Sequence, residues 1–221
     1  MPTTNAEQGA GSRVVPGSPV LVVLTGEPGA GKTTLCVGAA DFAKSRGLSV
    51  GGLLSLPHPA GDGNEWRRVT DIGSGEWQVL GRLRPPGCDS LPPSQCENRD
   101  GSGQAVSSVA DHTPLAWEFY ADAFPWANAR LASYADEPPD VLIVDEVGRL
   151  ELTRGGGWGS AVPLLAAGGY RLGITVVRPQ LLTVFAARVG SVVSSQIVEV
   201  RGNAAARAAA RGAIYRLIEQ L

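Results

Sequence analysis

Residues 26–33 combine glycines, a lysine and a threonine at a spacing that suits the binding of a phosphate chain. They read Gly-Glu-Pro-Gly-Ala-Gly-Lys-Thr, the full G-x-x-x-x-G-K-[ST] pattern known as Walker A. The glycines allow the backbone to curl so that N–H groups point at phosphate oxygens, and a helix that begins here adds its positive N-terminal end. A glycine-rich turn without a ligand would not need Gly-Lys-Thr at the start of a helix.

We call residues 26–34 the phosphate loop. Lys32 places a positive charge near the β- and γ-phosphates, which makes it a candidate catalytic as well as binding residue, and the Thr33 hydroxyl is the expected Mg²⁺ ligand. The residues expected to bind the nucleotide are Gly26, Glu27, Pro28, Gly29, Ala30, Gly31, Lys32, Thr33 and Thr34.

Two carboxylates follow an apolar run farther along the chain. Residues 141–144 read Val-Leu-Ile-Val, and Asp145 and Glu146 come directly after them. Such a strand delivers Asp145 to the carboxyl edge of a parallel sheet beside the phosphate loop, where it can hold Mg²⁺ directly or through water. Glu146 is the candidate general base that orients or deprotonates the attacking water. Acids often end strands, but the phosphate loop upstream favours a Walker B motif.

Two arginines are candidates for stabilising negative charge during phosphoryl transfer. Arg149 lies just beyond the acidic pair, and a solvated surface arginine is the alternative interpretation. Arg178 follows the strand expected at 171–177 and has a similar, weaker claim.

These candidate residues require a sheet whose strands end at one edge. Short apolar runs alternate with amphipathic stretches, which favours an α/β fold, and with the phosphate loop this predicts a three-layer P-loop NTPase sandwich. Its sheet is expected to be mostly parallel with one antiparallel hairpin. We expect strands at 19–24, 49–56, 141–144, 171–177 and 195–200, a hairpin at 66–71 and 76–83, and helices at 32–46, 159–167, 180–188 and 203–220.

A further helix is expected to start at Thr113 and Pro114, which suit a helix cap and first turn. It would run through Phe119 to Leu131, with Pro125 producing a kink.

The domain organisation follows from composition. Residues 1–18 predict a flexible N-terminal leader, and 19–221 predict a single P-loop NTPase domain. Between 84 and 112 the chain becomes rich in Pro, Gly, Ser and Asp, which predicts a long loop or lid inserted into that domain.

Composition also bears on partners and location. The formal net charge is −2, so no global field recruits nucleic acid or an anionic membrane. No apolar run approaches the roughly 20 residues that cross a bilayer, and the first residues contain no apolar signal core. Three cysteines predict no disulfide framework, and a single bond between Cys88 and Cys96 is the alternative. We therefore expect a cytoplasmic protein without membrane association, with no strong nucleic-acid signal, and no protein partner can be inferred.

With both motifs in hand, the chain resembles the THEP1-like nucleoside-triphosphatase family. The resemblance rests on residues 26–35, on Val-Asp-Glu-Val-Gly-Arg-Leu-Glu-Leu at 144–152, and on Val-Gly-Gly-Leu-Leu at 50–54. It implies Mg²⁺-dependent hydrolysis of ATP, GTP or other nucleoside triphosphates with broad base tolerance. Two features depart from the family's pattern: the 84–112 insertion is longer, and Asn203-Ala-Ala stands where an Asn-Arg-Asp-like run is expected.

Two other functions remain open. A P-loop kinase would transfer the γ-phosphate to a nucleoside, a nucleotide or an RNA end, and the predicted insertion could act as its lid. A nucleotide-binding switch module would bind without useful turnover, and Glu146 argues against it. The chain contains neither the Asn-Lys-x-Asp run of Ras-like GTPases nor the Leu-Ser-Gly-Gly-Gln run of transporter ATPases.

Overall fold

The computed structural model describes residues 18–61, 65–83, 117–190 and 193–221. Two sequence predictions fall outside these ranges: the leader at 1–18, except for its last residue, and the whole insertion at 84–112. Within the described residues, no helix is both long and apolar enough to span a bilayer.

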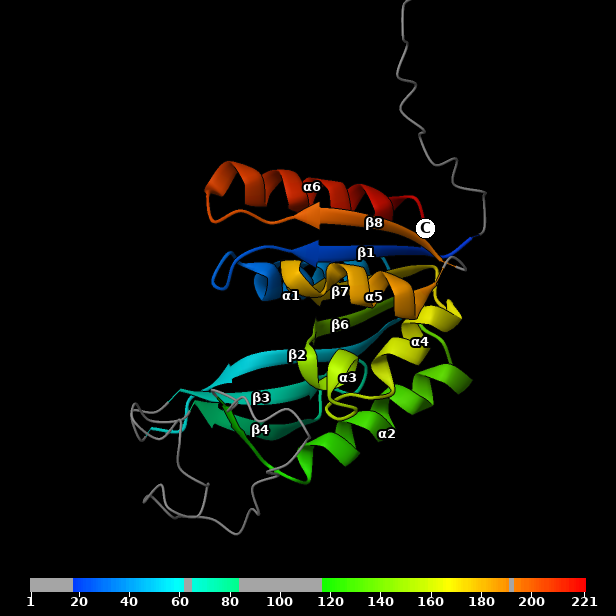
Figure 1. Cartoon of the computed structure of the whole chain (residues 1–221). Coiled ribbons are helices and arrows are strands. Elements are labelled where there is room, and N and C mark those ends of the chain that lie inside the picture. Colours follow the sequence, from blue (N-terminus) through cyan, green and yellow to red (C-terminus); the bar gives the residue numbers. More distant parts are fainter. Residues whose placement is uncertain (1–17, 62–64, 84–116, 191–192) are drawn as a thin grey trace, which may run out of the picture.

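The described residues form one eight-stranded sheet with the strand order β5-β4-β3-β2-β6-β7-β1-β8. The five strands from β2 to β8 in this order are mutually parallel, and β3, β4 and β5 continue the sheet in antiparallel pairs. The arrowheads of β1, β2 and β8 point to the left in Figure 1, so that edge holds the carboxyl ends of the parallel strands. The strands are β1 (Val20–Thr25), β2 (Val50–His58), β3 (Trp66–Asp71), β4 (Trp77–Leu83), β5 (Trp117–Phe119), β6 (Val141–Val147), β7 (Leu172–Val177) and β8 (Ser194–Glu199).

Helices cover both faces of the parallel strands because the strands are apolar on both sides. In β1, Leu21 and Val23 join one buried cluster while Val22 and Leu24 join the other. One face is covered by α1 (Lys32–Ser45) and α6 (Ala204–Glu219), and the other by α2 (Ala123–Asp136), α3 (Arg149–Thr153), α4 (Ala161–Ala167) and α5 (Leu182–Val189). A short 3-10 turn, Pro179–Leu181, precedes α5. The three-layer α/β sandwich with a mostly parallel sheet and an antiparallel hairpin is confirmed.

The helix expected from Thr113 is partly wrong. Thr113 and Pro114 lie outside the described residues, and Phe119 lies in β5, where it pairs with Gly81 of β4. The helix α2 begins only at Ala123, so Pro125 sits in its first turn. Backbone N–H groups of the first turn have no intrahelical acceptor, so a proline there breaks no hydrogen bond and requires no kink.

Candidate functional site

The phosphate loop connects β1 to α1 at the carboxyl edge of the sheet. It needs glycine at two places for reasons visible in the backbone. Gly26 has φ 134°, and a Cβ there would lie 2.2 Å from the Val200 carbonyl oxygen. Gly31 has φ 95° and a left-handed conformation at the N-cap of α1. Glu27, Pro28 and Gly29 are exposed at the tip of the loop.

Lys32 folds back over the phosphate loop. Its Nζ donates to the carbonyl oxygens of Gly26 and Glu27, both at 2.7 Å. Burial lowers the pKa of Lys32, and the charge of Glu146 opposes that shift while the charge of Arg178 adds to it. The ammonium group therefore lies within the curl of the loop, where it can bind phosphate oxygens.

Thr33 and Asp145, the two predicted Mg²⁺ ligands, lie side by side. The Asp145 carboxylate accepts a hydrogen bond from the Ser55 backbone N–H at 3.4 Å. Asp145 is 2% exposed, and burial raises its pKa to about 6. Carboxylate and hydroxyl oxygens are hard donors that suit Mg²⁺.

Thr33 and Asp145 suit a Mg²⁺ ion that is also coordinated by the phosphates of the substrate. Among the described residues, no group of three or more His, Cys, Asp and Glu side chains could hold a metal by itself. Mg²⁺ usually uses one or two carboxylates together with substrate phosphates and water. A site with one carboxylate ligand and one hydroxyl ligand beside a phosphate loop matches this usual coordination of Mg²⁺.

Glu146 has an unusual backbone. Its φ of 71° is the only positive φ at a non-glycine position among the described residues. The pairing of β6 with β7 is regular up to Val144 and resumes at Val147, so Asp145 and Glu146 form an irregularity in the strand. Asp145 consequently turns inward while Glu146 is exposed. Strained conformations of this kind cost of order 1–3 kcal/mol and often occur at functional sites.

Arg178 holds the Glu146 side chain. Its Nε and Nη2 donate to Glu146 Oε1 at 3.1 and 2.7 Å. The contact arises because β6 and β7 are neighbouring parallel strands whose carboxyl ends meet. Arg149 is exposed at the start of α3, and within the described part of the chain no comparable hydrogen bond joins it to Asp145 or Glu146. The structure thus places Arg178 in this group, and the role of Arg149 stays a prediction.

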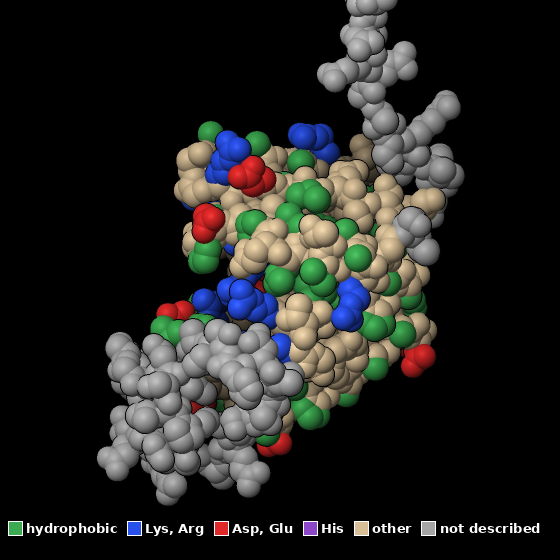
Figure 2. All heavy atoms as spheres, in the orientation of Figure 1, with side chains coloured by type: hydrophobic (Ala, Val, Ile, Leu, Met, Phe, Trp, Pro, Cys, Tyr) green, Lys and Arg blue, Asp and Glu red, His purple; other side chains and the backbone are tan. Residues whose placement is uncertain are grey.

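Figure 2 shows where charge gathers at this edge. Lysine and arginine side chains cluster on the left of the view, at the height of the strand ends that carry the site in Figure 1. A concentration of positive charge attracts polyanionic ligands such as nucleotides.

The remaining acidic residue of the second motif has a structural role. Glu151 accepts hydrogen bonds from the backbone N–H groups of Gly148 at 2.8 Å and Trp158 at 2.9 Å. Burial raises the pKa of Glu151. These bonds hold the segment that follows the catalytic carboxylate candidates, so the segment has a fixed geometry.

Sequence reasoning missed the support that the last helix gives to the phosphate loop. A Cβ at Gly31 would lie 3.0 Å from Cδ of Arg207, which belongs to α6. Asn203 accepts a hydrogen bond from the Ala206 N–H at 2.8 Å and caps α6. An asparagine directly before an alanine-rich helix is the signal that could have identified this cap.

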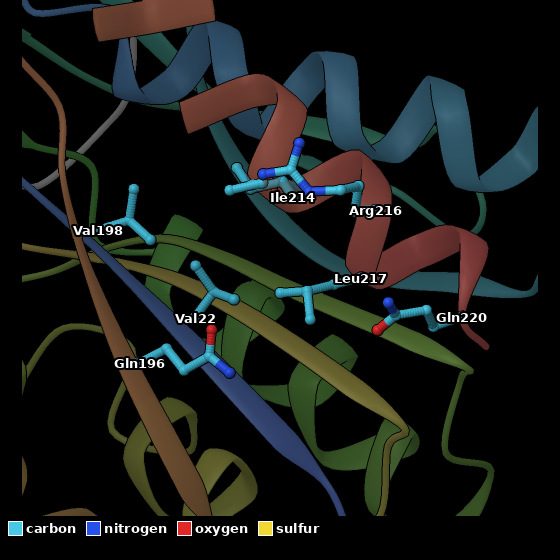
Figure 3. Close-up of a pocket in the computed structure, with 8 residues that line it drawn as sticks. Val22, Gln196, Val198, Ile214, Arg216, Leu217 and Gln220 are labelled. Carbon is cyan, nitrogen blue, oxygen red and sulfur yellow. The ribbon is translucent and has the colours of Figure 1, made fainter. Parts of the chain in front are cut away.

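A separate groove lies between α6 and the strands β1 and β8, and it has a volume of about 220 Å³ (Figure 3). Val22, Ile214 and Leu217 form apolar parts of its wall, and Gln196 and Gln220 add polar groups. None of its lining residues belongs to the predicted nucleotide site.

Because Asp145 is buried, we expect its ionisation to lower the free energy of unfolding, by an amount that depends on pH. Because its pKa is raised in the folded protein, folding takes up a proton between about pH 4 and pH 6, so this group lowers stability as pH rises through that window. The full cost of the charged carboxylate is then present at pH 7. We expect Asp145→Asn to stabilise the protein by roughly 2–3 kcal/mol at pH 7.5 in Mg²⁺-free buffer.

Urea unfolding of both proteins at pH 5 and pH 7.5 measures this effect. The stabilisation by Asp145→Asn should be clearly smaller at pH 5, where the wild-type carboxyl group is mostly protonated. Equal stabilities of the two proteins at pH 7.5 would show that the buried carboxylate carries no such cost.

Comparison with known proteins supports the interpretation of the motifs. A family model described as NTPase matches residues 21–92. The chain is 34% identical over 133 residues to the nucleoside-triphosphatase THEP1 of Caldivirga maquilingensis, covering 59% of this chain and 60% of that protein. It is 34% identical over 67 residues to the THEP1 of Methanothermobacter thermautotrophicus, covering 30% of this chain and 38% of the relative. The aligned regions thus span less than two thirds of these relatives' lengths.

The fold comparison covers more of the chain. The solution structure of a human cancer-related nucleoside triphosphatase matches with a TM-score of 0.56 and 23% identity, over 90% of this chain and 97% of that one. The likeness concerns the fold, a three-layer α/β sandwich. Together, these matches confirm that the chain resembles the THEP1-like nucleoside-triphosphatases, as residues 26–35 and 144–152 indicate.

Proposed function

We propose that the protein hydrolyses nucleoside 5′-triphosphates to the diphosphate and phosphate in a Mg²⁺-dependent reaction with broad base tolerance. The observation that carries this proposal is the position of the buried Asp145 beside Thr33 of the phosphate loop, with the exposed Glu146 as the next residue. The names of the THEP1 relatives support the same activity.

In the proposed reaction the protein binds the triphosphate through its phosphates. The backbone N–H groups of the phosphate loop and the Lys32 ammonium bind the β- and γ-phosphate oxygens. Thr33 and Asp145 would hold Mg²⁺, which neutralises charge that develops on the phosphate oxygens. All of these contacts address the phosphates and the metal, and this supports broad tolerance toward the base in ATP, GTP and other triphosphates.

Glu146 is the proposed general base. A water oxygen forms a bond to the γ-phosphorus while the bond from that phosphorus to the bridging β–γ oxygen breaks, and the bridging oxygen leaves on the diphosphate. The Glu146 carboxylate accepts the proton of the attacking water. An exposed carboxylate next to a buried Asp145 supports this division of roles, because Glu146 can reach solvent while Asp145 faces Thr33.

Phosphate release from ATP, GTP, CTP and UTP tests the proposal directly. We expect Mg²⁺-dependent release of phosphate from all four triphosphates. The rates should lie within about tenfold of each other, because the proposed contacts go to the phosphates and the metal. A tenfold difference corresponds to about 1.4 kcal/mol of discrimination between bases. Replacing Mg²⁺ with EDTA should abolish release.

The same assay, repeated with nucleosides, nucleoside monophosphates and RNA ends, separates the alternatives. Transfer of label to one of these acceptors, with little release in its absence, would replace the hydrolase with a kinase. Tight binding of triphosphates without turnover would indicate a switch module instead.

A further inference from the structure

The ion pair between Arg178 and Glu146 is the starting point of a further inference. In the nucleotide-free protein both donors of the Arg178 guanidinium bond one oxygen of the proposed base, at 2.7 and 3.1 Å. Two charged hydrogen bonds to one carboxylate oxygen leave that oxygen without a free acceptor position for an attacking water. The Oε1 atom of the proposed base is therefore engaged by Arg178 in this state.

The surroundings of the pair show what could release it. Arg178 follows β7, which pairs on one side with β6, the strand of Glu146, and on the other with β1, the strand that leads into the phosphate loop. The pair thus lies at the same sheet edge as the Lys32 ammonium that would bind the γ-phosphate. A γ-phosphate group bound there would present several negatively charged oxygens to Arg178, in competition with the single carboxylate of Glu146.

The exposure of the pair makes this exchange energetically easy. The side chains of Arg178 and Glu146 are 52% and 45% exposed. Ion pairs in such positions contribute about 0–1 kcal/mol to stability, because water screens them. A bound polyanion can outcompete an interaction of that size, whereas a buried pair would resist it.

The backbone explains why only the arginine would move. Glu146 stands at a left-handed backbone position within the irregular end of β6, so the strand fixes the point from which its side chain leaves the backbone. Arg178 carries a long flexible side chain on the residue that follows β7.

We propose that Arg178 is a nucleotide-sensing positioning residue: it holds Glu146 in the empty protein, and a bound γ-phosphate withdraws its guanidinium and frees the carboxylate for water. The proposal rests on the proposed phosphate site. A diphosphate lacks the competing group, so it should leave the ion pair intact. The protein would then activate its base only when a cleavable phosphate is present.

The chain offers a matched control for Arg178 at the opposite end of the same strand. Arg171 directly precedes β7 and pairs with Asp140 at 3.4 Å on the surface, with side-chain exposures of 48% and 32%. It therefore shares the chemistry and the exposure of Arg178 but lies at the edge away from the phosphate loop.

NMR of the arginine Nε–Hε groups tests the exchange without requiring turnover. The Arg178 signal, assigned with Arg178→Lys, should shift in Glu146→Gln without ligand, because the ion pair is lost. It should stay in place with Mg²⁺ and a diphosphate. With a non-hydrolysable triphosphate it should move to the same position in wild type and Glu146→Gln, while the Arg171 signal stays constant. A signal that responds equally to diphosphate and triphosphate would overturn the proposal.

Calorimetric affinities give a second readout. Arg178→Ala should weaken binding of the triphosphate analogue roughly 10- to 100-fold, the usual value of a hydrogen bond to a charged group, and leave diphosphate affinity within about twofold. Arg171→Ala should change neither. An equal loss of affinity for the triphosphate analogue and the diphosphate would contradict the proposal, because Arg178 would then not respond to the γ-phosphate. Failure of wild-type hydrolysis would remove the proposed function, whereas these ligand-dependent responses test the sensing role separately.

Discussion

Lys32→Ala is expected to lower triphosphate affinity by at least about 100-fold while the fold survives. The lysine supplies a full charge and several hydrogen bonds to phosphate oxygens, and each such bond contributes about 1.5–3 kcal/mol. Within the described residues its hydrogen bonds go to the Gly26 and Glu27 carbonyls of the phosphate loop, so the core does not depend on it. Calorimetric titration with a non-hydrolysable triphosphate measures the affinity, and circular dichroism measures whether the fold survives.

Lys44 provides the matched control, because it is the other lysine of the chain and belongs to the same helix. Its Nζ donates to the Ile72 carbonyl at 2.8 Å, far along α1 from the phosphate loop. Lys44→Ala should therefore keep wild-type affinity. A folded Lys32→Ala protein that binds the triphosphate as well as wild type does would remove the phosphate-loop assignment.

Glu146→Gln is expected to reduce single-turnover hydrolysis by roughly 10²–10⁴, the usual contribution of a positioned general base. Glutamine keeps the size and much of the hydrogen bonding of the side chain but cannot accept the proton. Triphosphate affinity should hold or rise, because one negative charge near the γ-phosphate is removed. Rapid-quench measurement of the cleaved nucleotide separates this chemical step from binding.

Two comparisons make the result specific. Glu219→Gln removes an exposed carboxylate that pairs with Arg46 away from the phosphate loop, and it should hydrolyse at the wild-type rate. Asp145→Asn removes a proposed metal ligand, so its defect should shrink as Mg²⁺ rises, while the defect of Glu146→Gln should not. Wild-type hydrolysis by Glu146→Gln would show that Glu146 is not the base.

The sequence alone predicted the parts of the site that lie in continuous motifs. Residues 19–46 predicted a strand, a glycine-bearing loop and a helix, and β1, that loop and α1 are found there. The apolar run before Asp145 predicted a buried strand, and β6 brings that carboxylate to Thr33. Such local patterns succeed because a parallel strand buried on both faces has a continuous apolar run and a single carboxyl edge.

The sequence could not reveal contacts that depend on strand order. Arg149 is close to the acidic pair along the chain, yet Arg178, more than thirty residues away, holds Glu146 because β6 and β7 are neighbours. The start of α2 was misjudged because Phe119 fits an apolar helical stripe, whereas β5 is a three-residue strand defined by its pairing with β4. Pairing partners that are distant in sequence leave no periodic signal in either segment.

The position of β1 between β7 and β8 has a consequence for the order in which the molecule can fold. This strand, which carries the phosphate loop, pairs on one side with Leu172–Val177 and on the other with Ser194–Glu199. During synthesis, β1 and the loop leave the ribosome long before either partner exists. Contacts so distant in sequence form slowly, since the chain must first lose the entropy of closing a long loop. The ability to bind nucleotide is therefore expected to arise only when the last strand and helix dock, and a chaperone would meet the unpaired apolar β1 in the meantime.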